Sequence, residues 1–164
     1  MSQGMVIDSL AYALETGSLQ GELPIASLTR VLDLLVDSTG VLSYRVDGKM
    51  GPRKRPQLVL AVDGVLALCC QRCLERIDYP VKLRSVLEFV TDEEDLTQEE
   101  LEDDAKDYLP AQEVVDVAAL IEDEVILDLP PAPRHERCAL PSAAREAEVL
   151  SPFSVLKDLK GKAR

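Results

Sequence analysis

The sequence contains few aromatic residues and no tryptophan. Only four tyrosines and two phenylalanines occur among 164 residues, although 46% of the residues are hydrophobic. A core must therefore be built mainly from leucine, valine, isoleucine and alanine. Proteins that bind single-stranded nucleic acid by stacking present several aromatic side chains to the bases. We therefore do not expect a stacking platform of that type.

The sequence also lacks long apolar runs and an obvious targeting segment. No uninterrupted apolar stretch approaches the roughly 18 residues needed to span a bilayer, so no membrane partner is expected. Residues 1–8 lack the basic and apolar regions of a secretory signal. With four cysteines and no such signal, we expect a cytoplasmic location. In a reducing compartment, a cysteine pair more often binds metal or performs redox chemistry than forms a structural disulfide.

Positive charge is scarce, and the excess of acids is concentrated in one segment. The net charge is −12, and ten acids with one base lie between Asp92 and Asp107. The rest of the chain is therefore close to neutral. This composition predicts a solvated, mobile acidic loop at about 92–107, with a contact surface for a basic partner as the alternative. A general nucleic-acid binder needs a basic footprint, so only a local basic patch remains compatible with that class.

Hydrophobic periodicity predicts an α+β fold in a single domain over 1–164, with a flexible C-terminal tail from about 139. A small N-terminal helix is expected at about 9–15 and a second helix at about 24–32. Asp116 resembles the N-cap of the main helix, which should run through about Leu127. Alternating segments and short turns predict an antiparallel sheet of about four to five strands. Asp63-Gly64 indicates a tight hairpin, and Tyr79-Pro80 a break before the next strand.

Reactive side chains concentrate at the end of the predicted hairpin. Cys70 and Cys73 form a C-x-x-C, and His135 and Cys138 are likewise separated by two residues. Both spacings match zinc half-sites, and three cysteines with one histidine are a known structural ligand set. One structural zinc is therefore one interpretation, and free thiols with a surface histidine are the other. Cys69 is expected to be a buried strand residue outside the ligand set.

Two catalytic interpretations also arise from the residues. The C-x-x-C suggests thiol-redox chemistry, but the residues that follow it are too few before Pro80 for the helix that usually activates such a thiol. The acids Glu122, Asp123, Glu124 and Asp128 suggest a metal-dependent nuclease. Consecutive acids on a helix point in different directions, however, so a solvated helix face explains them more simply.

Basic residues near the cysteine motif and in the 49–56 loop suggest a contact with RNA. The candidate contacts are Arg53, Lys54, Arg55, Arg72, Arg76, Lys82 and Arg84. Arg134 and Arg137 flank His135, so these bases would collect on one side if the two cysteine segments meet. Dispersed solubilising charge is the alternative.

The order of these motifs resembles the YceD-like family of large ribosomal RNA subunit accumulation proteins. The resemblance covers roughly 20–160 and is most specific at Cys-Gln-Arg-Cys (70–73), at the Glu-Asp-Glu helix ending in proline (121–130) and at Pro-Phe-Ser-Val-Leu-Lys-Asp-Leu-Lys (152–160). It implies a non-enzymatic factor supporting synthesis, processing or stability of 23S ribosomal RNA. The implied partner is that RNA, a pre-ribosomal large subunit or a basic ribosomal protein, with no small-molecule substrate. A thiol-redox or metal-dependent enzyme is the alternative.

Overall fold

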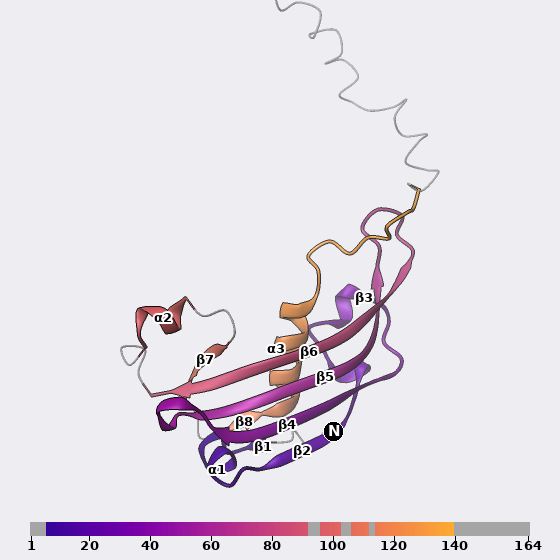
Figure 1. Cartoon of the computed structure of the whole chain (residues 1–164). Coiled ribbons are helices and arrows are strands. Elements are labelled where there is room, and N and C mark those ends of the chain that lie inside the picture. Colours follow the sequence, from indigo (N-terminus) through magenta and orange to yellow (C-terminus); the bar gives the residue numbers. More distant parts are fainter. Residues whose placement is uncertain (1–5, 92–95, 103–105, 112–113, 140–164) are drawn as a thin grey trace, which may run out of the picture.

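The computed structural model describes residues 6–91, 96–102, 106–111 and 114–139. A strongly curved sheet carries the long helix α3 (Val117–Asp128) against one face (Figure 1). The predicted α+β class and its main helix are confirmed. The expected four to five strands are too few, since the sheet has six strands and a separate pair adds two more.

The six-stranded sheet has the order β2-β4-β5-β6-β7, and β3 pairs with β5. The strands are β2 (Ser18–Pro24), β3 (Leu35–Asp37), β4 (Val41–Met50), β5 (Pro56–Cys69), β6 (Arg76–Val90) and β7 (Asp107–Pro110). β1 (Val6–Ile7) pairs antiparallel with β8 (Val115–Asp116). The prediction of a wholly antiparallel sheet is wrong at one edge, where β7 runs parallel to β6.

The two long central strands pass straight through the residues that predicted a turn and a break. Asp63-Gly64 lies inside β5, and Pro80 lies inside β6 opposite Val65. A Cβ on Gly64 would lie 2.4 Å from Leu42 Cδ2, so this glycine permits close packing rather than a turn. β7 pairs only with Leu87–Val90, which leaves β6 an edge strand at Pro80 among the described residues. Proline is tolerated on such an edge.

The predicted N-cap of the main helix, Asp116, is confirmed, but the helix predicted at 24–32 does not form. Asp116 Oδ1 accepts from the Ala118 N–H at 2.9 Å, and α1 (Ser9–Leu14) forms where a small N-terminal helix was expected. Over 24–32 the chain instead makes the short 3₁₀ turn Ile25–Ser27 and then irregular structure. The Arg30 N–H donates to Glu122 Oε1 at 2.6 Å, so a tertiary partner replaces the intrahelical bond.

The acidic segment is not a loop throughout. Gln98–Leu101 forms the short helix α2, and the Thr97 N–H donates to Glu100 Oε2 at 2.9 Å in a capping box. The loop prediction is therefore wrong for α2 and for the start of β7. Residues 92–95 and 103–105, and the predicted tail beyond 139, lie outside the described residues.

The core between α3 and the sheet is almost entirely aliphatic, as the composition predicted. Its fully buried members include Leu42, Val46, Leu58, Leu60 and Ile121. Among the described residues, no helix has the length and apolar character to cross a membrane. The fold places the β5–β6 turn at one end of the sheet, where the chain leaving α3 passes (Figure 1).

Candidate metal centre

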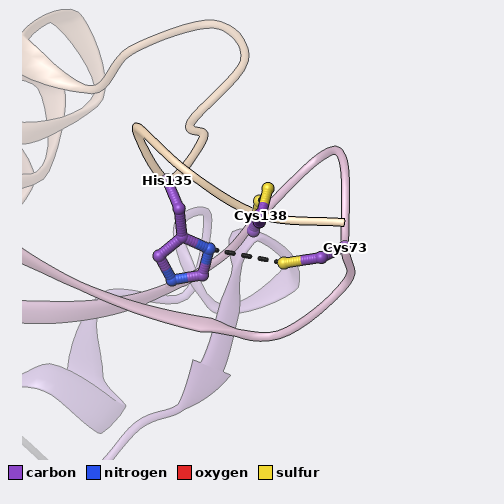
Figure 2. A group of neighbouring side chains, drawn as sticks. Cys73, His135 and Cys138 are labelled. Atoms are coloured by element: carbon purple, nitrogen blue, oxygen red, sulfur yellow. Dashed lines mark hydrogen bonds between the residues drawn. The ribbon is translucent and has the colours of Figure 1, made fainter. Parts of the chain in front are cut away.

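Four potential metal ligands converge at the β5–β6 turn. The ligand atoms of Cys70, Cys73, His135 and Cys138 all lie within 4.8 Å of one another. The Cys70 and Cys138 sulfurs are 3.9 Å apart, and Cys73 Sγ lies 3.3 Å from His135 Nδ1. Figure 2 shows the imidazole of His135 directed at the Cys73 sulfur with Cys138 beside them. The structure thus brings together the four residues proposed from their spacing.

The turn itself explains why the C-x-x-C presents both sulfurs on one side. The Cys70 N–H donates to the Glu75 carbonyl at 2.8 Å, and the Leu74 N–H donates to the Cys70 carbonyl at 2.9 Å. Leu74 adopts a left-handed conformation, with φ of 63°, which reverses the chain before β6 begins at Arg76. The motif therefore lies in the turn between β5 and β6, and the prediction that it follows a hairpin turning at Asp63-Gly64 is wrong. Cys69, at the end of β5, is only half-buried rather than buried as expected.

The proline-rich segment after α3 carries the second half of the group. α3 ends at Asp128, and Pro130 cannot continue it. The chain then crosses the turn, where the Gln71 N–H donates to the Pro133 carbonyl at 2.8 Å. That backbone bond sets the two halves against each other and places His135 and Cys138 opposite the C-x-x-C.

The histidine is held in the tautomer that a metal ligand requires. His135 Nε2 lies 3.0 Å from the Arg76 carbonyl oxygen. A carbonyl can only accept, so Nε2 carries the proton and Nδ1 directs its lone pair at the sulfurs. Metal-bound histidines commonly donate their other ring N–H to a carbonyl or carboxylate in this way.

The environment separates the pKa values of two of the thiols. Burial alone would raise the pKa of Cys70, but backbone N–H groups of Cys73, His135 and Arg72 donate toward its sulfur and lower the pKa to about 5. Burial and the neighbouring sulfurs raise the pKa of Cys138 to about 11. The thiolate form of Cys70 is therefore favoured, whereas burial and the neighbouring sulfurs disfavour ionisation of Cys138. A divalent cation would offset that repulsion and displace the remaining protons.

The dimensions of the group suit a tetrahedral ion. Zinc with sulfur ligands at about 2.3 Å gives sulfur–sulfur edges of about 3.8 Å, close to the 3.9 Å between Cys70 and Cys138. Four nitrogen and sulfur donors complete such a shell without an open position. The group can therefore hold a metal ion, and its geometry is that of a closed site.

A comparison with protein-family models identifies the family. Residues 58–160 match the model described as "Large ribosomal RNA subunit accumulation protein YceD". This match covers more than half of the chain. The chain belongs to the YceD family. No curated protein and no solved structure gave a significant match.

The YceD match includes both cysteine segments, whereas the basic loop at 53–55 precedes it. β5 lies between that loop and the turn, and its 14 residues at about 3.3 Å each give a length along the strand of roughly 45 Å. The two groups of candidate RNA contacts therefore lie at opposite ends of the β5–β6 ribbon. Lys82 and Arg84 lie between them on exposed positions of β6.

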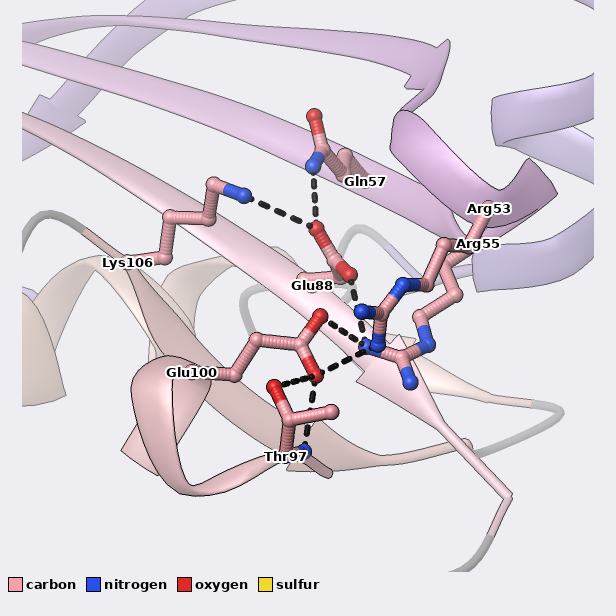
Figure 3. A network of polar contacts seen from close by, with 7 residues as sticks. All are labelled: Arg53, Arg55, Gln57, Glu88, Thr97, Glu100 and Lys106. Carbon is pink, nitrogen blue, oxygen red and sulfur yellow. Dashed lines mark hydrogen bonds and ion pairs between the residues drawn. The ribbon is translucent and has the colours of Figure 1, made fainter. Parts of the chain in front are cut away.

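Several of the basic side chains proposed as contacts already have partners within the chain. Arg53 and Arg55 bond Glu100 at 2.8 and 2.9 Å (Figure 3). Arg76 bonds Asp37 and Asp78 at 3.1 and 2.6 Å. The basic loop is thus joined to α2 of the acidic segment. No ion pair from Arg72, Lys82 or Arg84 is found within the described part of the chain.

A buried glutamate lies beneath this contact, and the sequence did not reveal it. The alternation in β6 places Glu88 on the polar side of the strand, yet it is 1% exposed. Its carboxylate lies 3.3 Å from Arg55 Nη1 and 3.6 Å from Lys106 Nζ, and it accepts from the Gln57 amide (Figure 3). Gln57 stands opposite Glu88 in the β5–β6 register, but that pairing could be found only once the hairpin was known.

The acids of α3 stabilise the fold of this YceD-family chain and do not form a shared metal site. Glu122 bonds Arg30 Nε at 2.9 Å, whereas Glu124 accepts from Ser85 on β6. Asp123 bonds Arg30 Nη1 at 2.6 Å, and Asp128 accepts from Tyr79 at 3.2 Å. Glu122 and Asp123 thus share Arg30, whereas Glu124 and Asp128 accept from side chains of β6. The expectation of a solvated face is also wrong for Glu122 and Glu124, which are 7% and 8% exposed.

Replacing Glu124 by glutamine should change how stability depends on pH. Burial raises the pKa of Glu124, the Ser85 hydrogen bond opposes this shift, and Asp107 and Asp123 add to it. Because the folded state holds this proton more tightly than the unfolded state, its contribution to stability is lost as pH rises through the folded pKa. The stability of Glu124→Gln relative to the wild type should therefore increase as the pH rises above about 4.5, the ordinary pKa of a glutamate.

Urea denaturation across that pH range measures the effect. Glu99→Gln, at an exposed position of α2, removes one carboxylate as a control and should leave the pH profile unchanged. Parallel profiles for the wild type and Glu124→Gln would contradict the prediction.

Proposed function

We propose that this chain is a non-catalytic factor supporting synthesis, processing or stability of 23S ribosomal RNA. The match to the large ribosomal RNA subunit accumulation family is the observation that carries this proposal. The factor binds 23S ribosomal RNA or a pre-ribosomal large subunit, with a basic ribosomal protein as the alternative partner. Its action in the cytoplasm stays a prediction from the sequence.

The metal group supports a structural role rather than catalysis. We assign Cys70, Cys73, His135 and Cys138 to one zinc ion, because thiolate and imidazole ligands in a tetrahedron favour zinc among the common divalent ions. Catalytic zinc usually keeps a position open for water or substrate, and four protein ligands occupy all positions. When bound, the ion would join the β5–β6 turn to the segment after α3.

The alternative of a thiol-redox enzyme has less support. Reactive C-x-x-C thiols commonly lie at a helix N-terminus, whereas this motif lies in a turn between two strands. Both of its sulfurs also face a second pair of potential ligands. These features favour metal ligation over exchange with an external disulfide.

Metal analysis combined with thiol titration should distinguish the two interpretations. Purified protein should contain about one equivalent of zinc, with only Cys69 reacting readily with a thiol reagent. Chelation under mild denaturation should expose the other three thiols. Protein without zinc but with one highly reactive thiol in the C-x-x-C would instead support redox chemistry.

The ribosomal RNA role should be tested in cells. Depletion of the protein should lower the ratio of 23S to 16S ribosomal RNA, and ultraviolet crosslinking should recover 23S sequences with the protein. A reduced ratio together with crosslinks to protein alone would favour a ribosomal protein as the partner. An unchanged ratio and no enrichment of 23S sequences would refute the proposed function.

The seven basic residues suggested by the sequence are not equally suitable as contacts of this factor. The pairing of Arg53 and Arg55 with Glu100 means that RNA phosphates would have to displace a carboxylate there. The net charge of −12 opposes broad electrostatic contact with RNA. A compact surface whose basic side chains form no ion pair with described residues is therefore the better candidate.

A further inference from the structure

We infer that the metal-linked end of the β5–β6 hairpin binds RNA phosphates through Arg72, Arg134 and Arg137. This inference rests on the proposed function, names the surface that carries it and makes that surface dependent on the metal. We call these three residues the arginine cluster.

The arginine cluster differs from most of the arginines that the structure describes in having no carboxylate partner among the described residues. Arg30, Arg45, Arg53, Arg55 and Arg76 each form at least one ion pair at 3.3 Å or less. All three side chains of the cluster are exposed, and none forms an ion pair with a residue that the structure describes. Arg84 is also unpaired in this sense, but it lies near Asp47 and lowers the pKa of that carboxyl.

The cluster is assembled by the candidate metal centre. Arg72 lies between two ligands, and Arg134 and Arg137 directly precede His135 and Cys138. Sixty-two residues lie between Arg72 and His135 in the sequence, yet Cys73 Sγ and His135 Nδ1 are only 3.3 Å apart. The metal ligands therefore fix the backbone positions from which the three arginine side chains extend. Loss of the metal would leave hydrogen bonds as the direct links between the segments, among them those of Gln71 with Pro133 and of His135 with Arg76.

This end of the hairpin is close to neutral although the chain is strongly acidic. Residues 70–76 and 131–138 contain four arginines and two glutamates, Glu75 and Glu136. Asp37 and Asp78 neutralise Arg76, and a zinc ion on three thiolates and a neutral histidine adds one negative charge. The acidic segment is joined to the opposite end of the ribbon through Glu100. The arginine cluster is therefore the most suitable place for an anion among the basic groups.

The chemistry of the cluster favours the phosphate backbone of RNA. Guanidinium groups bind phosphate oxygens in a bidentate manner. Tyrosine and phenylalanine are absent from residues 70–76 and 131–138, so base stacking on aromatic rings is unavailable there. Binding should consequently depend strongly on salt and weakly on base sequence.

Equilibrium binding of full-length protein to a transcribed 23S ribosomal RNA fragment tests the inference. The triple variant Arg72→Gln, Arg134→Gln and Arg137→Gln should bind at least roughly tenfold more weakly. Three lost phosphate contacts should also reduce the slope of log K against log salt concentration by about two for single-stranded RNA. Zinc content and circular dichroism should match the wild type, because no ligand is changed.

A matched control removes the same charge from the other end of the ribbon. Lys49→Gln, Arg53→Gln and Lys54→Gln are all exposed positions, and this triple variant spares Arg55 and its bond to Glu88. Its affinity should stay within about twofold of the wild type. An equal loss in the two triple variants would mean that only total charge matters, which would overturn the inference.

The metal dependence is measured on the wild type after chelation and after zinc is restored. Chelation should weaken RNA binding about as much as the triple arginine substitution, and zinc should restore it. Unchanged RNA binding after verified zinc loss would overturn the metal dependence. If the triple arginine variant bound RNA normally, the surface would be wrong but the proposed function would stand. If wild-type protein bound no RNA but bound a ribosomal protein, both the surface and the RNA form of the proposed function would fail.

Discussion

Replacing Cys70 by serine should lower the zinc content of the purified protein from about one equivalent to near zero. Cys70 is fully buried and lies 3.9 Å from the Cys138 sulfur, so no other thiol can take its place without moving the turn. An ion that binds only the folded state stabilises it by about 4 kcal/mol when its free concentration is a thousand times Kd. We therefore expect Cys70→Ser to lower the free energy of unfolding by at least that amount in zinc-containing buffer.

Cys69 provides a matched control for this substitution. It is adjacent to Cys70, but it lies outside the group of converging ligands and is only half-buried. Cys69→Ala should keep the zinc and nearly all of the stability. Metal analysis and thermal denaturation with and without chelator measure both quantities. Zinc loss in Cys69→Ala, or full retention in Cys70→Ser, would show that the ligand assignment is wrong.

Replacing Arg55 by alanine should destabilise the protein by about 3–5 kcal/mol, the usual cost of removing one partner from a buried ion pair. The Arg55 side chain is 13% exposed and that of Glu88 is 2% exposed. Without the guanidinium, Glu88 keeps Gln57 and a lysine nitrogen at 3.6 Å. That single remaining cation is at the long end of ion-pair distances, so much of the desolvation cost of Glu88 is left unbalanced.

The neighbouring Arg53 provides a control that distinguishes the effect of removing a buried cation from the effect of removing any cation. Arg53 also bonds Glu100, but its side chain is 52% exposed, so Arg53→Ala should cost less than about 1 kcal/mol. The double variant Arg55→Ala, Glu88→Gln should recover part of the stability, because the buried charge is removed as well. Urea denaturation gives all four values. Equal losses for the two arginine variants would contradict the assigned role of Glu88.

The Arg55 contact also changes the interpretation of the charge pattern. The sequence suggested a basic loop for RNA and a separate acidic loop for solubility or a basic partner. In the structure, Glu100 of α2 accepts from both Arg53 and Arg55, so these segments partly neutralise each other. Charge reversal at Arg55 would disturb the fold as well as any RNA contact. The arginine cluster at the metal centre avoids this ambiguity.

The alternation of apolar and polar residues predicted the strands more reliably than the glycine and proline residues predicted the turns. The alternation on both sides of Asp63-Gly64 correctly indicated strand, but the dipeptide was interpreted as a hairpin. Gly64 is required where Leu42 of β4 packs closely against β5, and this neighbour is 22 residues away in the sequence. Local turn statistics cannot include such a contact. Similarly, Pro80 ends no strand because β6 is at the edge of the sheet there.

The acids of α3 show the same limit. Their spacing indicated that they point in different directions. This argument against a nuclease site agrees with the structure, in which Glu122 and Asp123 bond Arg30 whereas Glu124 and Asp128 accept from β6. The sequence could not show that Glu122 would bond Arg30 or that Glu124 would bond Ser85. Those partners lie in segments 92 and 39 residues away. From the sequence alone, a buried acid with a distant partner therefore could not be distinguished from an exposed one.

The sequence by itself determined the class of the fold, the aliphatic core, the main helix with its N-cap and the types of ligand available to a metal. These properties depend on composition and on interactions between residues a few positions apart. Only the tertiary structure decided that the two halves of the ligand set meet, because that requires the path of β5, β6 and α3. The same path decided which basic side chains form ion pairs with described residues and which form none with them. Pairing across 62 residues, as between Cys73 and His135, is a property of the packed fold and not of local spacing.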